Sequence, residues 1–428
     1  MKILVIGSGG REHALAWKIK QSPRVSEVIV APGNAGTATE PGVRNVDIAM
    51  SDIDGLVALA HREDIALTVV GPEAPLVAGL VDRFRAEGLR CFGPRKIAAQ
   101  LEGSKAFAKD FLIRHNIPTA RYAVFHDLNP ALAYVRKNGA PIVIKADGLA
   151  AGKGVVVALT LADAEQALHD MLGAHSLGDA SSRVVIEEFL DGEEASYIVI
   201  SDGNHALPLA TSQDHKRRDD NDLGPNTGGM GAYSPAPVVT PDIEQRILRE
   251  IIQPTLAGMA SEGAPFIGFL YAGLMIAKDG SPRVIEFNVR MGDPETQPIM
   301  MRLKSDLVDV IDAALDGRLD RTSIGWDSRP ALGVVLAAHG YPGKVRSGDE
   351  IHGLDATTAI GSKIFHAGTK VENGKIVTSG GRVLTACALG RTFADAQAAA
   401  YAAASHLRFD GMLFRRDIGY RAISREMN

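Results

Sequence analysis

The stretch Arg283-Val-Ile-Glu-Phe-Asn288 and the loop after it, Val289-Arg-Met-Gly-Asp-Pro-Glu-Thr-Gln297, carry the residues around which the rest of the chain is organised. The alternation of apolar and polar residues predicts a strand, and residues two apart on a strand share a face. Glu286 and Asn288 are therefore expected to point the same way. A carboxylate and a carboxamide offer hard oxygen ligands, so this pair is a candidate Mg²⁺ site. An amphipathic strand followed by a polar turn gives the same pattern without a ligand.

The whole chain has the composition of an ordinary globular protein. It has 428 residues, 46% hydrophobic and 23% charged, with a net charge of −5. That length predicts several domains, and the absence of a long basic run argues against a nucleic-acid partner. No apolar run is long enough for a bilayer or a signal peptide, and Cys91 and Cys387 fit buried thiols. A cytoplasmic protein without disulfides is expected.

Residues 1–103 alternate apolar strand runs with helical patterns, which predicts a doubly wound parallel sheet. Ligands bind such sheets beyond the carboxyl ends of the strands. Three polar loops follow predicted strands there: Gly7-Ser-Gly-Gly-Arg-Glu-His13, Pro32-Gly-Asn-Ala-Gly36 and Gly71-Pro-Glu-Ala-Pro75. We expect the three loops to converge on one edge of the sheet.

The first loop is an incomplete dinucleotide-binding fingerprint. Gly7 and Gly9 fit the pattern, but Glu12 replaces the third glycine, which argues against nicotinamide binding. The backbone N–H groups of Gly9 and Gly10 at a helix N-terminus, with Arg11 beside them, suit a single phosphate monoester. A tight strand–helix turn with a surface arginine is the alternative.

Residues 121–190 are predicted to form a small lobe, preceded by a short helix that begins at Lys105. Within the lobe, the loop 146–154 joins two predicted strands and is rich in glycine, but it lacks the Walker A spacing. Such a loop can close over phosphates, and Lys145 just before it can reach phosphate oxygens. The acidic bend 185–194 suits an adenine slot, a hinge between two lobes, or both.

The polar stretch from Ser212 to Gly231 is unusually long for a loop in a compact domain. It fits a substrate-binding loop or a disordered segment. From about residue 327 the pattern begins again with a strand, a hairpin-like region and an alanine-rich helix. No catalytic constellation is visible in that last part, which we expect to pack against the site and close it.

Taken in order, these motifs resemble the ATP-grasp superfamily and, within it, the glycinamide ribonucleotide synthetase (phosphoribosylamine–glycine ligase) family. The resemblance spans residues 7–297 and rests on an ordered set of stretches. Besides the three N-terminal loops and Gly292-Asp-Pro-Glu-Thr-Gln297, these are Ile144-Lys-Ala-Asp-Gly-Leu-Ala-Ala-Gly-Lys-Gly154, Ser212-Gln-Asp-His-Lys216 and Gly224-Pro-Asn-Thr-Gly-Gly-Met-Gly231.

The resemblance implies a multidomain α/β and α+β fold. Its parts are an N-terminal doubly wound domain (1–103), a large ATP-grasp lobe (104–120 plus 191–326), a small ATP-grasp lobe (121–190) and a small C-terminal α+β domain (327–428). It implies that ATP, glycine and 5-phosphoribosylamine give ADP, phosphate and glycinamide ribonucleotide through glycyl phosphate, with Mg²⁺ or Mn²⁺, in purine biosynthesis. We expect a cytoplasmic monomer that binds small molecules and binds neither nucleic acid nor a membrane.

The resemblance also implies roles for individual residues. Glu286 and Asn288 would hold the metal. Catalytic roles would fall to Arg290 at the glycine carboxylate, Asp214 or Asp293 at its ammonium group, and Lys216. The nucleotide would contact Lys105, Lys145, Gly152, Lys153, Gly154, Glu187, Phe189, Leu190, Glu193 and Glu194. The other substrate contacts would be Gly9, Gly10, Arg11, Asn34, Glu73, Asn226 and Thr227.

Three other functions fit parts of the pattern. Another ATP-grasp ligase, a carboxylase or a peptide-type ligase, would share the nucleotide site without needing the N-terminal phosphate loops. A nicotinamide oxidoreductase would use the first domain alone, against which Glu12 argues. A non-catalytic nucleotide-binding regulator would not need the full set of lysines, acids and asparagine.

Overall fold

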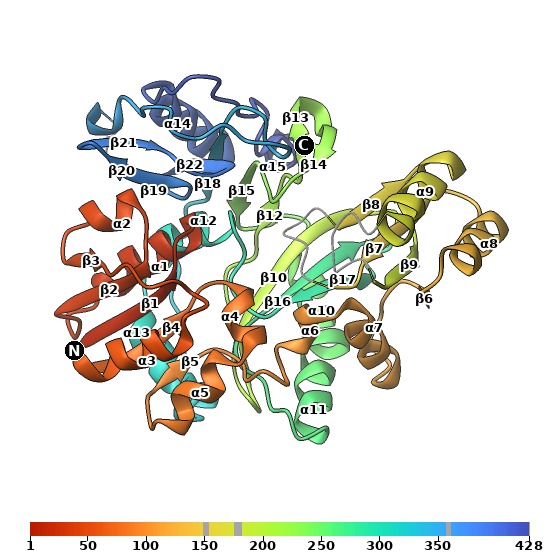
Figure 1. Ribbon diagram of the computed structural model, residues 1–428, viewed down its shortest axis with the longest axis horizontal. Helices are drawn as coiled ribbons and strands as arrows, with labels where there is room; N and C mark the ends of the chain where they lie inside the picture. Colours follow the sequence, from red (N-terminus) through yellow and green to blue (C-terminus); the bar gives the residue numbers. More distant parts are fainter. Residues whose placement is uncertain (149–153, 175–181, 357–360, 428) are drawn as a thin grey trace.

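The computed structural model describes residues 1–148, 154–174, 182–356 and 361–427. Three bodies surround a central antiparallel sheet (Figure 1): the N-terminal domain, a small lobe on the opposite side, and the C-terminal domain above. Within the described ranges, no helix combines the length and the apolar character that crossing a membrane requires.

The N-terminal domain is built on a parallel sheet in the order β3-β2-β1-β4-β5, which confirms the predicted doubly wound sheet. Its order reverses between β1 and β4, so the loops after these two strands open at the same edge. The strands are β1 (Lys2–Gly7), β2 (Glu27–Pro32), β3 (Val43–Asn45), β4 (Ile65–Val70) and β5 (Cys91–Phe92). The helices are α1 (Gly10–Lys20), α2 (Ala35–Thr39), α3 (Ile53–Arg62), α4 (Glu73–Ala78), α5 (Leu80–Ala86) and α6 (Gln100–Gly103).

The small lobe has a sheet in the order β6-β9-β7-β8 and a hydrophobic core of its own. Val135, Ile144 and Ile186, each fully buried, belong to that core. Its elements are β6 (Tyr122–Phe125), α8 (Leu128–Asn138), β7 (Ile142–Ala146), β8 (Val155–Ala158), α9 (Leu161–Leu168), the π-helix His169–Gly173 and β9 (Val184–Glu188).

The central sheet has the order β11-β10-β16-β17, and its last strand is the predicted strand that ends in Asn288. Strand β17 contains a bulge: Glu286 pairs with Gly273 and Val284 with Leu274, which leaves Ile285 as an extra residue. The strands are β10 (Glu193–Asp202), β11 (Ala206–Pro208), β16 (Ile267–Ile276) and β17 (Pro282–Asn288). The helices around it are α7 (Lys105–Arg114), α10 (Pro241–Ile247), the π-helix Leu248–Ile252, α11 (Gln253–Ser261), α12 (Thr296–Arg302) and α13 (Leu307–Leu315).

The C-terminal sheet has the order β12-β15-β18-β22-β19 and includes two strands from the polar stretch 212–231 and its end. That stretch is therefore ordered structure, and the disordered alternative is wrong. The sheet strands are β12 (Gln213–Asp214), β15 (Gly231–Ser234), β18 (Ala331–Ala337), β19 (Ser362–His366) and β22 (Arg382–Leu389). The remaining elements are the hairpins β13 (Arg217–Asp219)–β14 (Leu223–Asn226) and β20 (Thr369–Glu372)–β21 (Lys375–Thr378), and helices α14 (Phe393–Ser405) and α15 (Tyr420–Met427).

Candidate active site

A cavity of about 680 Å³ lies where the central sheet meets the small lobe, the N-terminal loops and the C-terminal domain. It brings together most of the predicted site residues, although they come from the N-terminal domain and both ATP-grasp lobes. The predicted residues in its wall are Arg11, Glu73, Lys105, Lys145, Gly154, Glu187, Phe189, Leu190, Glu193, Glu194, Asp214, Lys216, Asn226, Thr227, Glu286, Asn288, Arg290 and Asp293. Gly152 and Lys153 lie outside the described residues.

The candidate metal ligands, Glu286 and Asn288, line this cavity from the end of β17. Burial alone raises the pKa of the Glu286 carboxyl, but Lys216, Lys145 and Lys105 more than offset it, so its pKa lies below the ordinary value. Within the described ranges, neither side chain has a hydrogen bond or an ion pair, so both keep free oxygen ligands.

The donor set fits an ion that shares its ligands with phosphates. Among the described residues, no group of three or more His, Cys, Asp or Glu side chains is placed to hold a metal by itself. One carboxylate and one carboxamide leave most of an octahedral shell to phosphate oxygens and water, which is how Mg²⁺ is usually bound beside nucleotides.

Two lysines of the cavity wall are held by one buried carboxylate, that of Glu187. Lys145 Nζ lies 2.8 Å from Glu187 Oε1, and Lys109 Nζ lies 2.9 Å from Oε2. Lys145 also donates a hydrogen bond of 3.0 Å to the carbonyl oxygen of Ile285, the bulge residue. Glu187 therefore anchors cations in this structure, and its predicted contact with adenine stays a prediction.

Lys109 is a cavity residue that sequence reasoning missed. It follows Lys105 by four positions on α7, so both lie on one helix face, and that spacing was a usable signal. Burial lowers the pKa of Lys109 to about 8 despite Glu187 beside it. Burial also lowers the pKa of Lys105, whose Nζ donates 3.0 Å to the carbonyl oxygen of Gly148.

The bend predicted to bind the nucleotide presents both apolar side chains and ion-paired carboxylates to the cavity. Phe189 and Leu190 line the cavity, and Phe189 is 39% exposed. The Glu194 carboxylate pairs with Lys216 at 2.7 Å, whereas Glu193 is held by Arg425 from the C-terminal helix at 2.7 Å. The lysine and the arginine fix both carboxylates at the cavity wall.

Arg290 is clamped between two carboxylates. Its Nε lies 3.2 Å from Glu73 Oε2 and its Nη2 lies 2.8 Å from Glu102 Oε1. Glu102 Oε2 also accepts a hydrogen bond of 2.8 Å from the Val289 backbone N–H. Burial raises the pKa of the Glu102 carboxyl to about 7. Sequence reasoning missed Glu102, because a lone acid in a short helix carries no signal.

The two candidate acids for the glycine ammonium group lie on the same cavity wall. Burial raises the pKa of Asp214 to about 7. Asp293 pairs with Arg382, whose Nη2 lies 3.4 Å from Asp293 Oδ2. Arg382 begins β22 in the C-terminal domain, where no site residue was expected; it donates a further hydrogen bond of 2.6 Å to the carbonyl oxygen of Gly228.

The loop after β1 and the start of α1 reach the cavity through Arg11. Its Nη1 donates 3.2 Å to the carbonyl oxygen of Met291, which joins α1 to the loop after β17. The N–H of Gly9 donates to Glu12 Oε2 at 2.6 Å, and its predicted contact with a phosphate stays a prediction. Gly10 and Arg11 remain the candidates for an anion at this helix N-terminus.

Asn34 is occupied by structural contacts. Its Oδ1 accepts from the N–H groups of Gly36 and Thr37, as an N-cap does. Its Nδ2 donates to the carbonyl oxygens of Ser8 at 2.9 Å and His366 at 2.8 Å. Asn34 thus ties two N-terminal loops to the C-terminal domain, and its predicted contact with a ribose stays a prediction.

Comparison with known proteins matches this architecture to a single family. Three family models fit the chain in succession: Phosphoribosylglycinamide synthetase, N domain (residues 1–102), ATP-grasp (A) domain (residues 103–296) and C domain (residues 331–421). The phosphoribosylamine–glycine ligase of Allochromatium vinosum is 65% identical over 426 residues, covering 100% of both chains. That of Salmonella typhimurium is 64% identical over 429 residues, covering 100% of both.

Solved structures give the same match. The crystal structure of phosphoribosylamine–glycine ligase from Thermotoga maritima is 35% identical, has a TM-score of 0.83 and covers 98% of this chain and 100% of its own. A biotin carboxylase from Campylobacter jejuni shares the fold at 15% identity, with a TM-score of 0.73 and coverage of 96% and 92%.

Proposed function

The chain belongs to the phosphoribosylglycinamide synthetase family, and from this we propose that it joins glycine to 5-phosphoribosylamine at the expense of ATP. The products are glycinamide ribonucleotide, ADP and phosphate, a step of purine biosynthesis. The ATP-grasp domain and the relatives' shared activity support this assignment. We further propose that the protein works as a cytoplasmic monomer.

One observation carries the proposal: an uncommitted pair of oxygen ligands faces the same cavity as lysines and the N-terminal phosphate loop. Glu286 and Asn288 supply the ligands, Lys105 and Lys145 supply positive charge, and Arg11 arrives from the first domain. A nucleotide-binding regulator needs no anion site on the first domain. A carboxylase does not need an anion site on the first domain next to a binding site for an amino acid.

The first step overcomes the poor reactivity of a carboxylate. A glycine carboxylate oxygen attacks the γ-phosphorus of ATP, a new P–O bond forms, and the bond to the β-phosphate breaks to release ADP. Such a transfer depends mainly on alignment and charge neutralisation. Lys105 and Lys145 hold the phosphates, and Arg290, kept in place by Glu73 and Glu102, pairs with the glycine carboxylate.

The second step forms the amide. The amine of phosphoribosylamine attacks the carbonyl carbon of glycyl phosphate, the C–N bond forms, phosphate leaves, and the amine nitrogen gives up a proton. Gly10 and Arg11 hold the sugar phosphate, and Asp214 stays close to the glycine nitrogen. Glycyl phosphate hydrolyses in water, so a cavity bounded by several domains favours the amine over water as the attacking group.

Glu286 and Asn288 would hold one Mg²⁺ or Mn²⁺ ion, or two. When bound, the ion supplies Lewis-acid charge at the phosphate oxygens. The ionised state of Glu286 and the absence of other partners for it among the described residues support this assignment.

The test is ADP release from Mg-ATP with glycine or phosphoribosylamine omitted in turn. We expect rapid ADP formation only with both present, because the acyl phosphate is protected until the amine binds. ADP formation with a different carboxylate would keep the nucleotide site and refute glycine as the substrate. No ADP with any carboxylate and amine pair would overturn the enzymatic proposal in favour of a regulator.

A further inference from the structure

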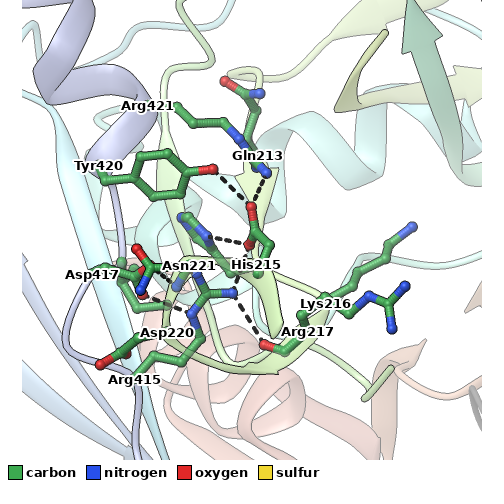
Figure 2. A network of polar contacts seen from close by, with 12 residues as sticks. Gln213, His215, Lys216, Arg217, Asp220, Asn221, Arg415, Asp417, Tyr420 and Arg421 are labelled. Atoms are coloured by element: carbon green, nitrogen blue, oxygen red, sulfur yellow. Dashed lines mark hydrogen bonds and ion pairs between the residues drawn. The ribbon is translucent and has the colours of Figure 1, made fainter. Parts of the chain in front are cut away.

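A polar network around one buried arginine joins the tip of the β13–β14 hairpin to the C-terminal segment 415–421 (Figure 2). Arg415 is at its centre and is only 1% exposed. Its Nη1 donates 2.8 Å to Asp222 Oδ1 and 3.1 Å to the carbonyl oxygen of Arg217. Its Nε and Nη2 hold the Asp417 carboxylate, each at 2.8 Å. One buried guanidinium therefore links the hairpin to the last part of the chain.

Asp222 receives most of its contacts from that last part. Its Oδ2 accepts from Tyr420 Oη at 2.7 Å and from Arg421. The His215 ring accepts a hydrogen bond from the Gly419 N–H through Nε2, so its Nδ1 carries the proton, 3.8 Å from Asp222 Oδ1. Together, His215, Tyr420 and Arg415 hold the pKa of the Asp222 carboxyl well below its usual range.

The hairpin tip is strained, and the C-terminal segment stabilises it. Asn221 and Asp222 have φ values of 61° and 54°, a left-handed conformation that residues with a side chain adopt rarely and seldom in succession. The N–H of Asn221 donates 2.8 Å to Asp417, and the N–H of Arg416 donates 2.7 Å to Asp220. Such outliers persist only where their surroundings determine them.

The other side of this hairpin is a wall of the cavity. Lys216, Arg217, Asp222, Asn226 and Thr227 line the cavity, whereas Arg415 and Tyr420 do not. Figure 2 shows the side chains of Lys216 and Arg217 extending away from the network. Thr227 Oγ1 donates 2.8 Å to the carbonyl oxygen of Lys216, which ties the two ends of this wall together.

We propose that Arg415 and Tyr420 are positioning residues: they act through Asp222 to hold the cavity wall 216–227 in place for ATP and glycine, without touching either. The proposal rests on the proposed function for the identity of the substrates. Arg415 and Tyr420 thus take part in the reaction from outside the cavity, whereas Arg421 of the same segment lines it. Most of the contacts predicted for phosphoribosylamine belong to the N-terminal domain, and only Asn226 and Thr227 belong to this wall.

The test compares Tyr420→Phe and Arg415→Lys with Tyr197→Phe as a matched control. Tyr420→Phe removes one hydroxyl and keeps the ring beside His215. Tyr197 also donates a hydrogen bond to a carboxylate, Glu244 at 3.1 Å, but neither residue lines the cavity. Arg415→Lys keeps the charge and loses the guanidinium fork.

For both test variants, we expect the KM for ATP and for glycine to rise about tenfold, the worth of one charge-assisted hydrogen bond. The KM for phosphoribosylamine should rise less, because most of its predicted contacts lie on the N-terminal domain, and all three values for the control should stay within about twofold. Equal changes for all three substrates, or a loss of kcat alone, would show general destabilisation and overturn the proposal.

Limited trypsin digestion gives a second readout that needs no turnover. Cleavage after Lys216, Arg217 or Arg218 should appear early in both test variants and not in the wild type or the control, with the melting temperature little changed. Identical digestion patterns would refute the proposal that Arg415 and Tyr420 hold the wall 216–227 in place. If the wild type releases no ADP, the proposed function fails, while the digestion result still decides whether the network holds the wall.

Discussion

Replacing Glu102 by glutamine should make the protein more stable at neutral pH and less active. The Glu102 carboxylate is buried behind Arg290, with one oxygen 2.8 Å from Arg290 Nη2 and the other accepting 2.8 Å from the Val289 N–H. Burial of the charge outweighs both contacts, since the pKa is raised to about 7. Glutamine has nearly the same shape and no charge to desolvate.

The size of the effect follows from the pKa. A shift from 4.5 to about 7 corresponds to about 3 kcal/mol, at about 1.4 kcal/mol per unit. Because the folded pKa is raised, the stabilisation by the bound proton is present at low pH and is lost as pH rises through 7. The free energy of unfolding of the variant, minus that of the wild type, should therefore increase by about 2–3 kcal/mol between pH 5 and pH 8.

Urea unfolding of both proteins at pH 5, 6, 7 and 8 measures this difference. Its change with pH is the informative quantity, because the absolute difference also contains the loss of an acceptor at Val289. Glu372→Gln, at an exposed glutamate, should give a flat line. A flat line for Glu102→Gln would refute the reasoning. At pH 8 the kcat/KM for glycine should fall about tenfold, because Arg290 loses one of its two charged partners.

Two further changes test the site. Glu286→Gln should reduce turnover at least about 100-fold and raise the Mg²⁺ concentration required, with an unchanged melting temperature; near-normal activity with unaltered Mg²⁺ dependence would exclude this metal ligand. Arg11→Gln should raise the KM for phosphoribosylamine about tenfold and leave the KM for ATP unchanged, as measured by ADP release; an equal rise in both would remove Arg11 from the sugar-phosphate site.

Much of the fold could be predicted from the sequence because it follows from local patterns. Apolar runs alternating with helices predicted the parallel sheet, and Glu286 and Asn288, which were expected to point the same way, both line the cavity. The short helix predicted to begin at Lys105 does begin there, with the Ser104 side chain accepting a hydrogen bond from the Phe107 N–H as its N-cap. These signals depend on residues that are close in the sequence, so contacts between distant parts of the chain do not change them.

The features that the sequence did not predict depend on contacts between distant parts of the chain. Arg382 reaches the cavity, and Arg425 reaches the cavity residue Glu193, only because the C-terminal domain folds back over them; no local pattern marks either arginine. The pairing of Glu187 with Lys109 and Lys145 is likewise tertiary. The bulge at Ile285 depends on how β17 pairs with β16, so strict alternation could not reveal it.

The C-terminal sheet has a consequence for how this protein could exchange parts with its relatives. Strand β15 belongs to the sequence of the central region, yet it pairs with residues 331–334 of β18 along its whole length. A chimaera joined near residue 330 would take β18 from one parent and β15, which pairs with it, from the other. The backbone ladder would still form, but the packing of Tyr233 against Phe393 across that junction would have to match. Recombination is therefore expected to succeed where both strands come from the same parent, although they lie about a hundred residues apart in the sequence.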